Sequence, residues 1–595
     1  MVDATGAAVP HAKVVAKNQA TGAEWNTESG NLGIYLLPSL PIGLYELDVT
    51  AKGFETSVAR NITLDAASTV TQDVKLQIGE VSQLVTITTE TPVIDSSTIT
   101  MGQVIDQKTT QEIPLNGRHF VDLSLLTPGT VTPPATGFLT APLRGQGSFA
   151  YITAGQREDT INYLVNGINL SDMVQNQITF QPSINTVSEF KIDNSTYSAQ
   201  YGRNSGSIVN IATRSGTNDF HGELFDFVRN SAMDARNFFN PSFTSTGAFN
   251  PQSPFKRNNF GAAAGGPIQR SRAHFFASYE GLRQRQGITI NSLVLPPNSV
   301  GSDAAVQALI ALIPASNTTE AGQPFFVGSS LAPVNIDQGT GDVDVELTGR
   351  DRLHGYVAIQ QDLRQEPTLQ GNTLPGWGDT RSSRRQIGTV SEDHVFGPAL
   401  SNTVRVGYNR IHIVFNPNQL LNSASFGISN GINAPIGLAQ IDIGTGALDF
   451  GGPATFPQGR GDTSAVLNDT LSWLKGRHNF SIGGEVRRVY NDNFVLDTTI
   501  FRFATVSSFL SDSASSFTFA GTQANRILSP AYDGFAEDSF KMTSNFTLQL
   551  GLRYSWYVTP SESANRFTVF DPASQSLVPV GSGSAFHTNN KNFQP

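Results

Sequence analysis

The chain has 595 residues, so several domains or one very large domain are expected. Charged residues make up 15 %, below the roughly 25 % of soluble globular proteins, whereas Phe alone contributes 38 residues. The net charge of −10 argues against nucleic acid as the main partner, and the absence of cysteine excludes disulfides and thiolate metal sites. No run approaches the ~18 apolar residues of a spanning helix. The composition instead suits a β-barrel, whose strands alternate lipid-facing and lumen-facing residues.

Neither end of the chain shows a boundary signal. Residues 1–3 lack the basic and apolar regions of a signal peptide. The tail, KNFQP at 591–595, stops in a polar stretch without a closing element. We therefore expect a fragment that is open at both ends.

Residues 1–78 alternate apolar and polar side chains with turn signals at short intervals, which predicts a small β-sandwich. Tyr45, Leu47 and Val49 should form its buried face. The motifs DATGAAVPHAKV, GIYLLPSLPIGLYELDV and AKGFE resemble the carboxypeptidase regulatory-like domain. That name implies no protease activity, because the chain has no H-E-x-x-H motif.

Residues 79–106 form a predicted linker that contains one β-prone stretch, EVSQLVTITTETP at 80–92. It ends at Pro92, which cannot donate to a ladder. One reading is an ordinary linker strand. The other is a coupling strand that pairs with a partner's sheet edge. Its candidate residues are Leu84, Val85, Thr86, Ile87, Thr88 and Thr89.

Residues 107–219 are a mixed segment. DLSLL at 122–126, followed by TPG, predicts one short helix or turn, and strands are expected at 162–167 and 189–192. At 198–227 the chain changes abruptly from Gly, Ser, Asn and Thr around IVNI to the aromatic run FHGELFDF. This change predicts passage from a polar, enclosed domain to a wall that faces lipid.

Residues 220–595 supply the predicted wall. FTLQLGLRYSW at 546–556 alternates apolar and polar residues over eleven positions, within the ~9–11 that cross a bilayer at a tilt. Similar strands are expected at 343–348, turning into 353–359, and at 480–487 after the turn at 475–478. The stretch 221–228 does not alternate well. The polar stretches 287–340 and 416–463 are expected to be long outer loops.

The motifs PLNGRHF, NYLVNGINLSD, VSEFKIDNSTYSAQYGRNSGSIVNIATRSGTN and FHGELFDFVRN occur in that order, and NNFGAAAGGPIQRSRAHFFASYEGLRQRQG follows at 258–287. They resemble the plug and first barrel strands of TonB-dependent outer-membrane receptors, of the Oar-like group with an N-terminal regulatory-like domain. The resemblance implies a mainly β fold: a β-sandwich, a plug domain at 107–219, and at 220–595 the N-terminal part of a large antiparallel transmembrane barrel. Plugged transporters have about 22 strands, and about ten or eleven candidates are visible on the ~10-residue alternating template.

The resemblance also implies a function and a location. The protein would take up an unknown ligand across the outer membrane of a Gram-negative cell, with its N-terminal domain in the periplasm. Its partners would be outer-membrane lipid and a TonB-like periplasmic coupling protein that moves the plug. A surface adhesin or secretion-assisting protein anchored by the barrel is the alternative. A soluble carbohydrate-binding protein of several sandwiches fits less well, because the apolar face at 546–556 would need a second sheet to cover it.

The sequence indicates no catalytic, cofactor or metal site. It contains no phosphate-binding loop of the G-x-x-x-x-G-K-[ST] type, and its nine His are scattered without metal-ligand spacing. We therefore expect a protein that is not an enzyme. If residues 107–219 lie inside the barrel, four arginines are candidates to pair with lumen carboxylates such as Glu346 or Glu485. These arginines are Arg144, Arg157, Arg203 and Arg214.

Overall fold

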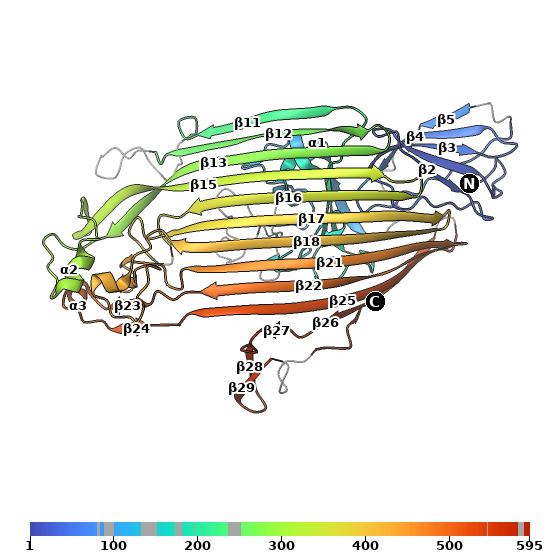
Figure 1. Ribbon diagram of the computed structural model, residues 1–595. Coiled ribbons are helices and arrows are strands. Elements are labelled where there is room, and N and C mark those ends of the chain that lie inside the picture. Colours follow the sequence, from blue (N-terminus) through green and yellow to red (C-terminus); the bar gives the residue numbers. More distant parts are fainter. Residues whose placement is uncertain are drawn as a thin grey trace.

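A computed structural model describes residues 1–79, 84–88, 100–132, 151–169, 171–172, 176, 181–195, 197–235, 252–369, 371–543, 546–580 and 588–594. Long antiparallel strands form a curved wall, with a separate sheet near the N-terminus at one end and short helices at the other (Figure 1). The chain is therefore mainly β, as its composition predicts. Among the described residues, none of the helices has the length and apolar character to cross a membrane.

The N-terminal sheet has the strand order β2-β1-β3-β4-β5. Its strands are β1 (Lys13–Asn18), β2 (Glu24–Glu28), β3 (Gly43–Thr50), β4 (Thr56–Leu64) and β5 (Leu84–Thr88). Alternation along β3 places Tyr45, Leu47 and Val49 in the core, each no more than 4 % exposed. The buried face predicted from the sequence is thus confirmed.

A second sheet, of order β6-β9-β10-β7-β8, lies behind the wall. Its strands are β6 (Met101–Ile105), β7 (Asn162–Val165), β8 (Ile168–Asn169), β9 (Val187–Ser195) and β10 (Ile208–Thr213). Its helices are α1 (Gln107–Glu112), η1 (Phe120–Leu126), η2 (Glu158–Thr160) and η3 (Ile184–Thr186). The short helix or turn predicted at 122–126 is the 3₁₀ helix η1. We call residues 101–219 the plug segment.

The wall is one antiparallel sheet of 14 strands. Its path runs β11-β12-β13-β15-β16-β17-β18-β21-β22-β25-β26-β30, and β14 and β27 pair beside this path with β15 and β25. The long strands are β11 (His221–Asn230), β12 (Phe255–Gln269), β13 (Ala273–Leu293), β15 (Gln323–Glu346), β16 (Asp351–Gln365), β17 (Asp379–Gly397), β18 (Leu400–Pro417), β21 (Gln458–Lys475), β22 (His478–Val495), β25 (Gln523–Lys541) and β26 (Thr547–Tyr557). The short ones are β14 (Thr318–Glu320), β27 (Ser561–Glu562) and β30 (Phe593–Gln594). Within the described residues β11 does not pair with β26 or β30, so the sheet is open, as expected for part of a barrel.

The strands predicted from alternation are confirmed. The best of them, at 546–556, is β26, on which Leu550 and Leu552 are 60 % and 49 % exposed while Arg553 and Ser555 are buried. The stretch that does not alternate well is also a strand, β11, because its backbone pairs with β12 along its whole length. Strand formation there follows from pairing, not from a buried face.

The long connections expected at 287–340 and 416–463 are present at 294–322 and 418–457, but they are shorter than expected because long strands occupy their ends. Strand β13 continues to Leu293, β15 begins at Gln323, and β21 begins at Gln458. Ala332, Val334 and Ile336 are buried at alternate positions of β15, and polar residues between them obscure the strand pattern in the sequence.

Four connections at this far end build a compact unit that we call the outer cap. It contains α2 (Ala304–Ile310), η4 (Ser423–Phe426), β19 (Gln440–Ile443), β20 (Leu448–Phe450), β23 (Ile500–Phe503), α3 (Val506–Leu510) and β24 (Ser516–Thr518). Leu438, Phe450 and Phe509 are fully buried in its core. A separate hairpin, β28 (Thr568–Asp571) and β29 (Ser576–Pro579), lies after β26.

Aromatic side chains on the outer face of the wall mark two levels. Near the short turns between strands, at the end that carries the N-terminal sheet, lie Trp473, Phe480 and Phe540; nearer the outer cap lie Tyr408, Tyr490, Tyr532 and Trp556. Phe480 and Tyr490 are ten positions apart on β22, which is about 33 Å of strand and roughly 25 Å of height at a tilt of ~40°. That height matches the apolar band of an outer-membrane barrel. Ile482, exposed between the two levels, faces its hydrocarbon.

Candidate functional site: the interface between plug segment and wall

Several polar contacts hold the plug segment against the inner face of the wall. Glu537 on β25 accepts hydrogen bonds from the Ser198 hydroxyl and the Ala199 N–H, both at 2.7 Å. On the next strand, Arg553 donates to the Gln200 carbonyl at 2.8 Å and pairs with Asp533 at 2.9 Å. These hydrogen bonds involve charged groups and are therefore directional. Water can replace either partner when the plug segment moves away.

A second group of contacts anchors β10 of the plug segment. The Thr213 hydroxyl donates to Asp342 Oδ2 at 2.6 Å, and His354 Nε2 lies 3.0 Å from the same oxygen. Thr213 and Asp342 are both buried. One wall carboxylate therefore connects the last plug strand to β15 and β16.

Two wall arginines reach the loop that follows β8. Arg487 Nη1 donates to Asn169 Oδ1 at 2.6 Å, and Arg460 Nη2 donates to Asp172 Oδ2 at 3.2 Å. Each arginine also pairs with an acid two positions away on its own strand. The lumen acids are thus neutralised mainly within the wall.

The plug segment and the wall also share an apolar contact that sets their spacing. Ile168 of β8 packs on β18 at Gly407, where a methyl group would lie 2.3 Å from Ile168 Cγ2. Glycine is required at position 407 for this close approach. Apolar wall residues such as Tyr356 and Val466 complete the core of the plug segment.

Among the described residues, none of the candidate arginines forms a salt bridge with Glu346 or Glu485, although Arg203 lies near Glu485. Glu485 pairs with Arg487 at 2.7 Å and Glu346 with Arg352 at 3.9 Å, because wall arginines on the same face lie nearer than the plug segment. The predicted plug arginines have other contacts. Arg214 approaches Glu223 at 3.6 Å and stacks over Phe276, Arg157 pairs with Asp159, and Arg144 lies outside the described residues.

Arg203 has the least favourable environment of the predicted arginines. Burial and the nearby Arg487 lower the pKa of its guanidinium to about 10. Its Nη1 atom is buried and finds no hydrogen-bond acceptor in the described part of the chain. The nearby carboxylates Glu485 and Asp533 offset part of this effect on the pKa.

Enclosure of the last plug strand can be tested by thiol labelling, since the chain has no cysteine of its own. Ser207 is completely buried, whereas Ser205 is exposed. We expect Ser207→Cys to react with a bulky, impermeant maleimide at least about tenfold more slowly than Ser205→Cys. Mass spectrometry of intact cells at timed intervals measures both rates. Equal rates would contradict the buried position of residue 207.

The N-terminal sheet docks on β9 of the plug segment. The Glu189 carboxylate accepts the Ala66 N–H, and Lys191 Nζ donates to the Ala67 carbonyl at 3.2 Å. The loop at 65–68 is thereby held against the plug segment. Tyr45 and the rest of the N-terminal core lie away from this contact.

This contact should depend on pH. Burial raises the pKa of the Glu189 carboxyl to about 7 from its ordinary 4.5. A raised pKa means that the contact is fully stable below about pH 4.5 and weakens as pH rises through about 7. We expect pH-corrected hydrogen exchange at residues 65–68 to rise over that interval. Glu189→Gln should flatten the profile, and a variant that keeps the same pH dependence would exclude this carboxyl as the cause.

The candidate coupling strand lies on the edge of the N-terminal sheet. Strand β5 pairs in parallel with β4, with Leu84 opposite Thr56 and Thr88 opposite Arg60. Thr89, the last predicted residue, lies outside the described residues. The structure therefore brings five of the six predicted residues together as one strand.

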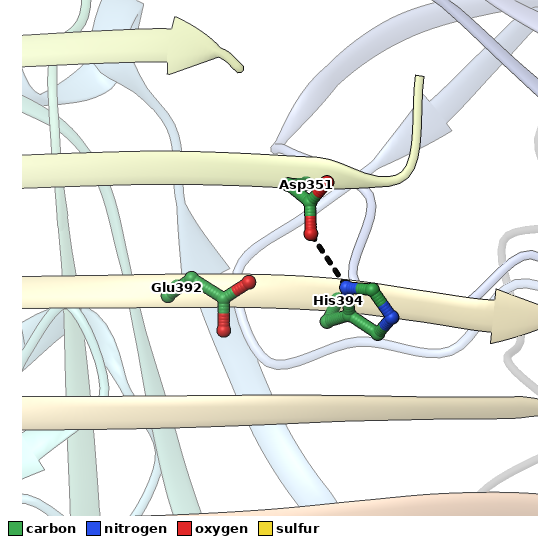
Figure 2. A group of neighbouring side chains, drawn as sticks. All are labelled: Asp351, Glu392 and His394. Carbon is green, nitrogen blue, oxygen red and sulfur yellow. Dashed lines mark hydrogen bonds and ion pairs between the residues drawn. The ribbon is translucent and has the colours of Figure 1, made fainter. Parts of the chain in front are cut away.

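One cluster of possible metal ligands was not foreseen from the sequence. Figure 2 shows Asp351 on β16 beside His394 and Glu392 on β17, with ligand atoms within 4.8 Å of one another. Sequence spacing missed this group, because register, not proximity in the chain, places Asp351 opposite His394. His394 Nδ1 lies 2.5 Å from Asp351 Oδ1, and Asp351 also accepts from Thr348. These hydrogen bonds explain why the side chains lie together: they connect the end of β17 to the start of β16.

Family models match both parts of the chain. The model described as "Outer membrane beta barrel domain" matches residues 212–302 and 294–595, well over half of the chain. The model of the carboxypeptidase regulatory-like domain matches residues 1–77. The regulatory-like resemblance of the N-terminal part is thus confirmed.

Individual proteins are similar over parts of the chain. The TonB-dependent transporter Oar of Myxococcus xanthus is 26 % identical over 256 residues, which is 42 % of this chain and 23 % of that protein. The aligned part thus spans about a quarter of this relative's length. The outer membrane transporter YddB from Escherichia coli has a TM-score of 0.51 at 12 % identity, over 77 % of this chain and 56 % of that one. The siderophore receptor PiuA from Acinetobacter baumannii has a TM-score of 0.46 at 11 % identity, over 81 % and 60 %.

The match to YddB shows a shared fold and agrees with the open wall seen here. The wall lies in the outer membrane of a Gram-negative type of cell, with the short turns on the periplasmic side. The lipid-facing band, the polar lumen and the family model together lead to one conclusion: the chain belongs to the outer membrane β-barrel domain family.

Proposed function

We propose that the protein is an outer-membrane receptor that takes up a ligand when a TonB-like periplasmic protein displaces the plug segment. The observation that carries this proposal is the polar seat of the plug segment. Its bonds to Glu537, Arg553 and Asp342 join groups that water solvates equally well once they separate. The chain acts, on this proposal, by binding and transport and not as an enzyme.

We further propose a division into four parts. These are a regulatory-like sandwich at 1–78, a linker with the coupling strand at 79–106, a plug at 107–219 and a partial barrel at 220–595. The Myxococcus relative is named a TonB-dependent transporter, which supports a coupling partner of this kind. So does β5, whose pairing with β4 indicates a backbone able to add to a sheet edge.

The second candidate is a barrel-anchored adhesin, which the outer cap favours. The cap has its own apolar core and stands above the membrane on the side opposite the N-terminal sheet. An adhesin would need no coupling partner. The two proposals therefore differ in their energy requirement.

Uptake with and without the coupling protein separates them. Cells that express the protein are grown with the partner present or deleted, and untargeted mass spectrometry measures which solutes disappear from the medium. We expect at least one solute to be depleted only when both proteins are present. Equal solute depletion in both strains would favour the adhesin, provided that cell attachment is also the same with and without the coupling partner.

A further inference from the structure

A pocket of 530 Å³ opens on the outer face of the wall where β21 turns into β22. Its lining comprises Trp473, Lys475, Gly476, Arg477, His478, Phe480 and Phe540. The turn belongs to the same end of the wall as the N-terminal sheet (Figure 1). This pocket has no part in the seating of the plug segment, which contacts the opposite face of these strands.

Flat rings form the floor of the pocket. His478 is stacked parallel to Phe540 at 4.2 Å and to Phe480 at 5.5 Å. Trp473 extends the surface, with its ring 5.6 Å from that of Phe480. Such a floor is apolar but offers polarisable faces, and aromatic residues of this kind prefer the boundary between hydrocarbon and headgroups.

Two cations rise from the rim. Lys475 Nζ lies 5.0 Å from the centre of the Trp473 ring, and the exposed Arg477 donates one bond to the Met542 carbonyl at 3.0 Å. On the neighbouring strand β25, Asp538 is paired with His478 at 2.7 Å. The pocket therefore presents positive charge above an apolar floor, which is the complement of an anionic amphiphile.

The level of the pocket relative to the membrane identifies that amphiphile. Phe480 marks the periplasmic end of the ~25 Å apolar band, and Lys475 and Arg477 lie just beyond it in the turn. That is the level of the phosphates of the periplasmic leaflet. We propose that the pocket binds a phospholipid of this leaflet, with its phosphate on Lys475 and Arg477 and its glycerol and upper acyl carbons against the rings. The proposal requires membrane insertion only and is independent of transport.

Trp473 provides a local probe. The protein is purified in dodecyl maltoside, and quenching of its tryptophan fluorescence is titrated with dibrominated phosphatidylglycerol and with dibrominated diacylglycerol, which lacks the phosphate. The Trp473→Phe variant gives the part of the signal that comes from the other tryptophans. We expect phosphatidylglycerol to quench Trp473 at a concentration at least about tenfold lower than diacylglycerol does, because each basic residue near a lipid phosphate favours binding several-fold.

Charge variants decide whether the pocket is responsible. Lys475→Glu with Arg477→Glu should abolish the preference for phosphatidylglycerol, whereas Lys475→Arg with Arg477→Lys should keep it and so control for folding. Arg350→Glu places the same kind of change in another exposed turn of this end, between β15 and β16, and should leave the preference intact. Equal quenching by both lipids, or an equal loss in the Arg350 variant, would overturn the proposal in favour of unspecific surface attraction.

Discussion

Proline at position 85 or 87 should reduce uptake to background while ligand binding at the cell surface persists. Both residues lie in β5, which can bind a partner only through its main chain if it acts as a coupling strand. Proline lacks the N–H that such a ladder needs and fixes φ. Alanine keeps the N–H, so Val85→Ala and Ile87→Ala should retain most of the uptake. The measurement is depletion of the solute identified in the uptake experiment, with binding to intact cells assayed in parallel.

The alternating direction of N–H groups along the strand allows a more specific test. The N–H groups of residues 85 and 87 point to one edge of β5, and that of Thr86 points to the other. One of these edges pairs with β4 in the structure, and the other is open. If Thr86→Pro behaves like the wild type while the other two fail, the partner uses a single edge. If all three proline variants transport normally, this segment is an ordinary linker strand.

A disulfide between positions 213 and 342 should block uptake completely and reversibly. Thr213 belongs to the plug segment and Asp342 to the wall, and their side-chain oxygens lie 2.6 Å apart. Sulfur atoms that replace Thr213 Oγ1 and Asp342 Cγ would lie close enough to bond with small side-chain adjustments. A covalent bridge cannot exchange with water, so the plug segment would stay seated. Because the chain has no cysteine, no other thiol competes.

Controls separate locking from damage. Thr213→Cys and Asp342→Cys alone each remove the hydrogen bond and should keep substantial uptake, since such a bond contributes only about 0.5–3 kcal/mol. The double variant should lose uptake after oxidation and regain it after treatment with a reductant. Uptake that continues in the oxidised, fully bridged protein would show that the plug segment does not need to leave its seat at β15.

Alternation revealed the membrane-spanning strands well, because lipid on one face and a polar lumen on the other impose opposite demands on successive residues. Arg553 and Ser555 were assigned in this way to the polar face of β26, and they are buried there. Alternation does not predict, however, which side chains contact each other across the structure. Asp342 meets Thr213 across 129 positions, and Glu537 meets Ser198 across 339. Such contacts depend on the register of the whole wall.

The strand extensions at 287–293 and 323–340 were not predicted, because polar residues such as Asn335 and Asp337 interrupt the apolar ones. Val334 and Ile336 are nevertheless buried at alternate positions of β15. The helix α1 was missed for another reason. It has only six residues, and its clearest signal is Asp106, whose side chain accepts from the Thr109 N–H as an N-cap.

The outer cap has a consequence for immune recognition and for engineering of the cell surface. Its core joins Leu295, Trp377, Phe450 and Phe509, which come from four separate connections between wall strands. No single connection folds by itself, so a peptide copied from one of them would not reproduce the surface that the cell displays. Antibodies that bind living cells should recognise discontinuous epitopes, and sequence variation in this region should occur as correlated changes across the four connections.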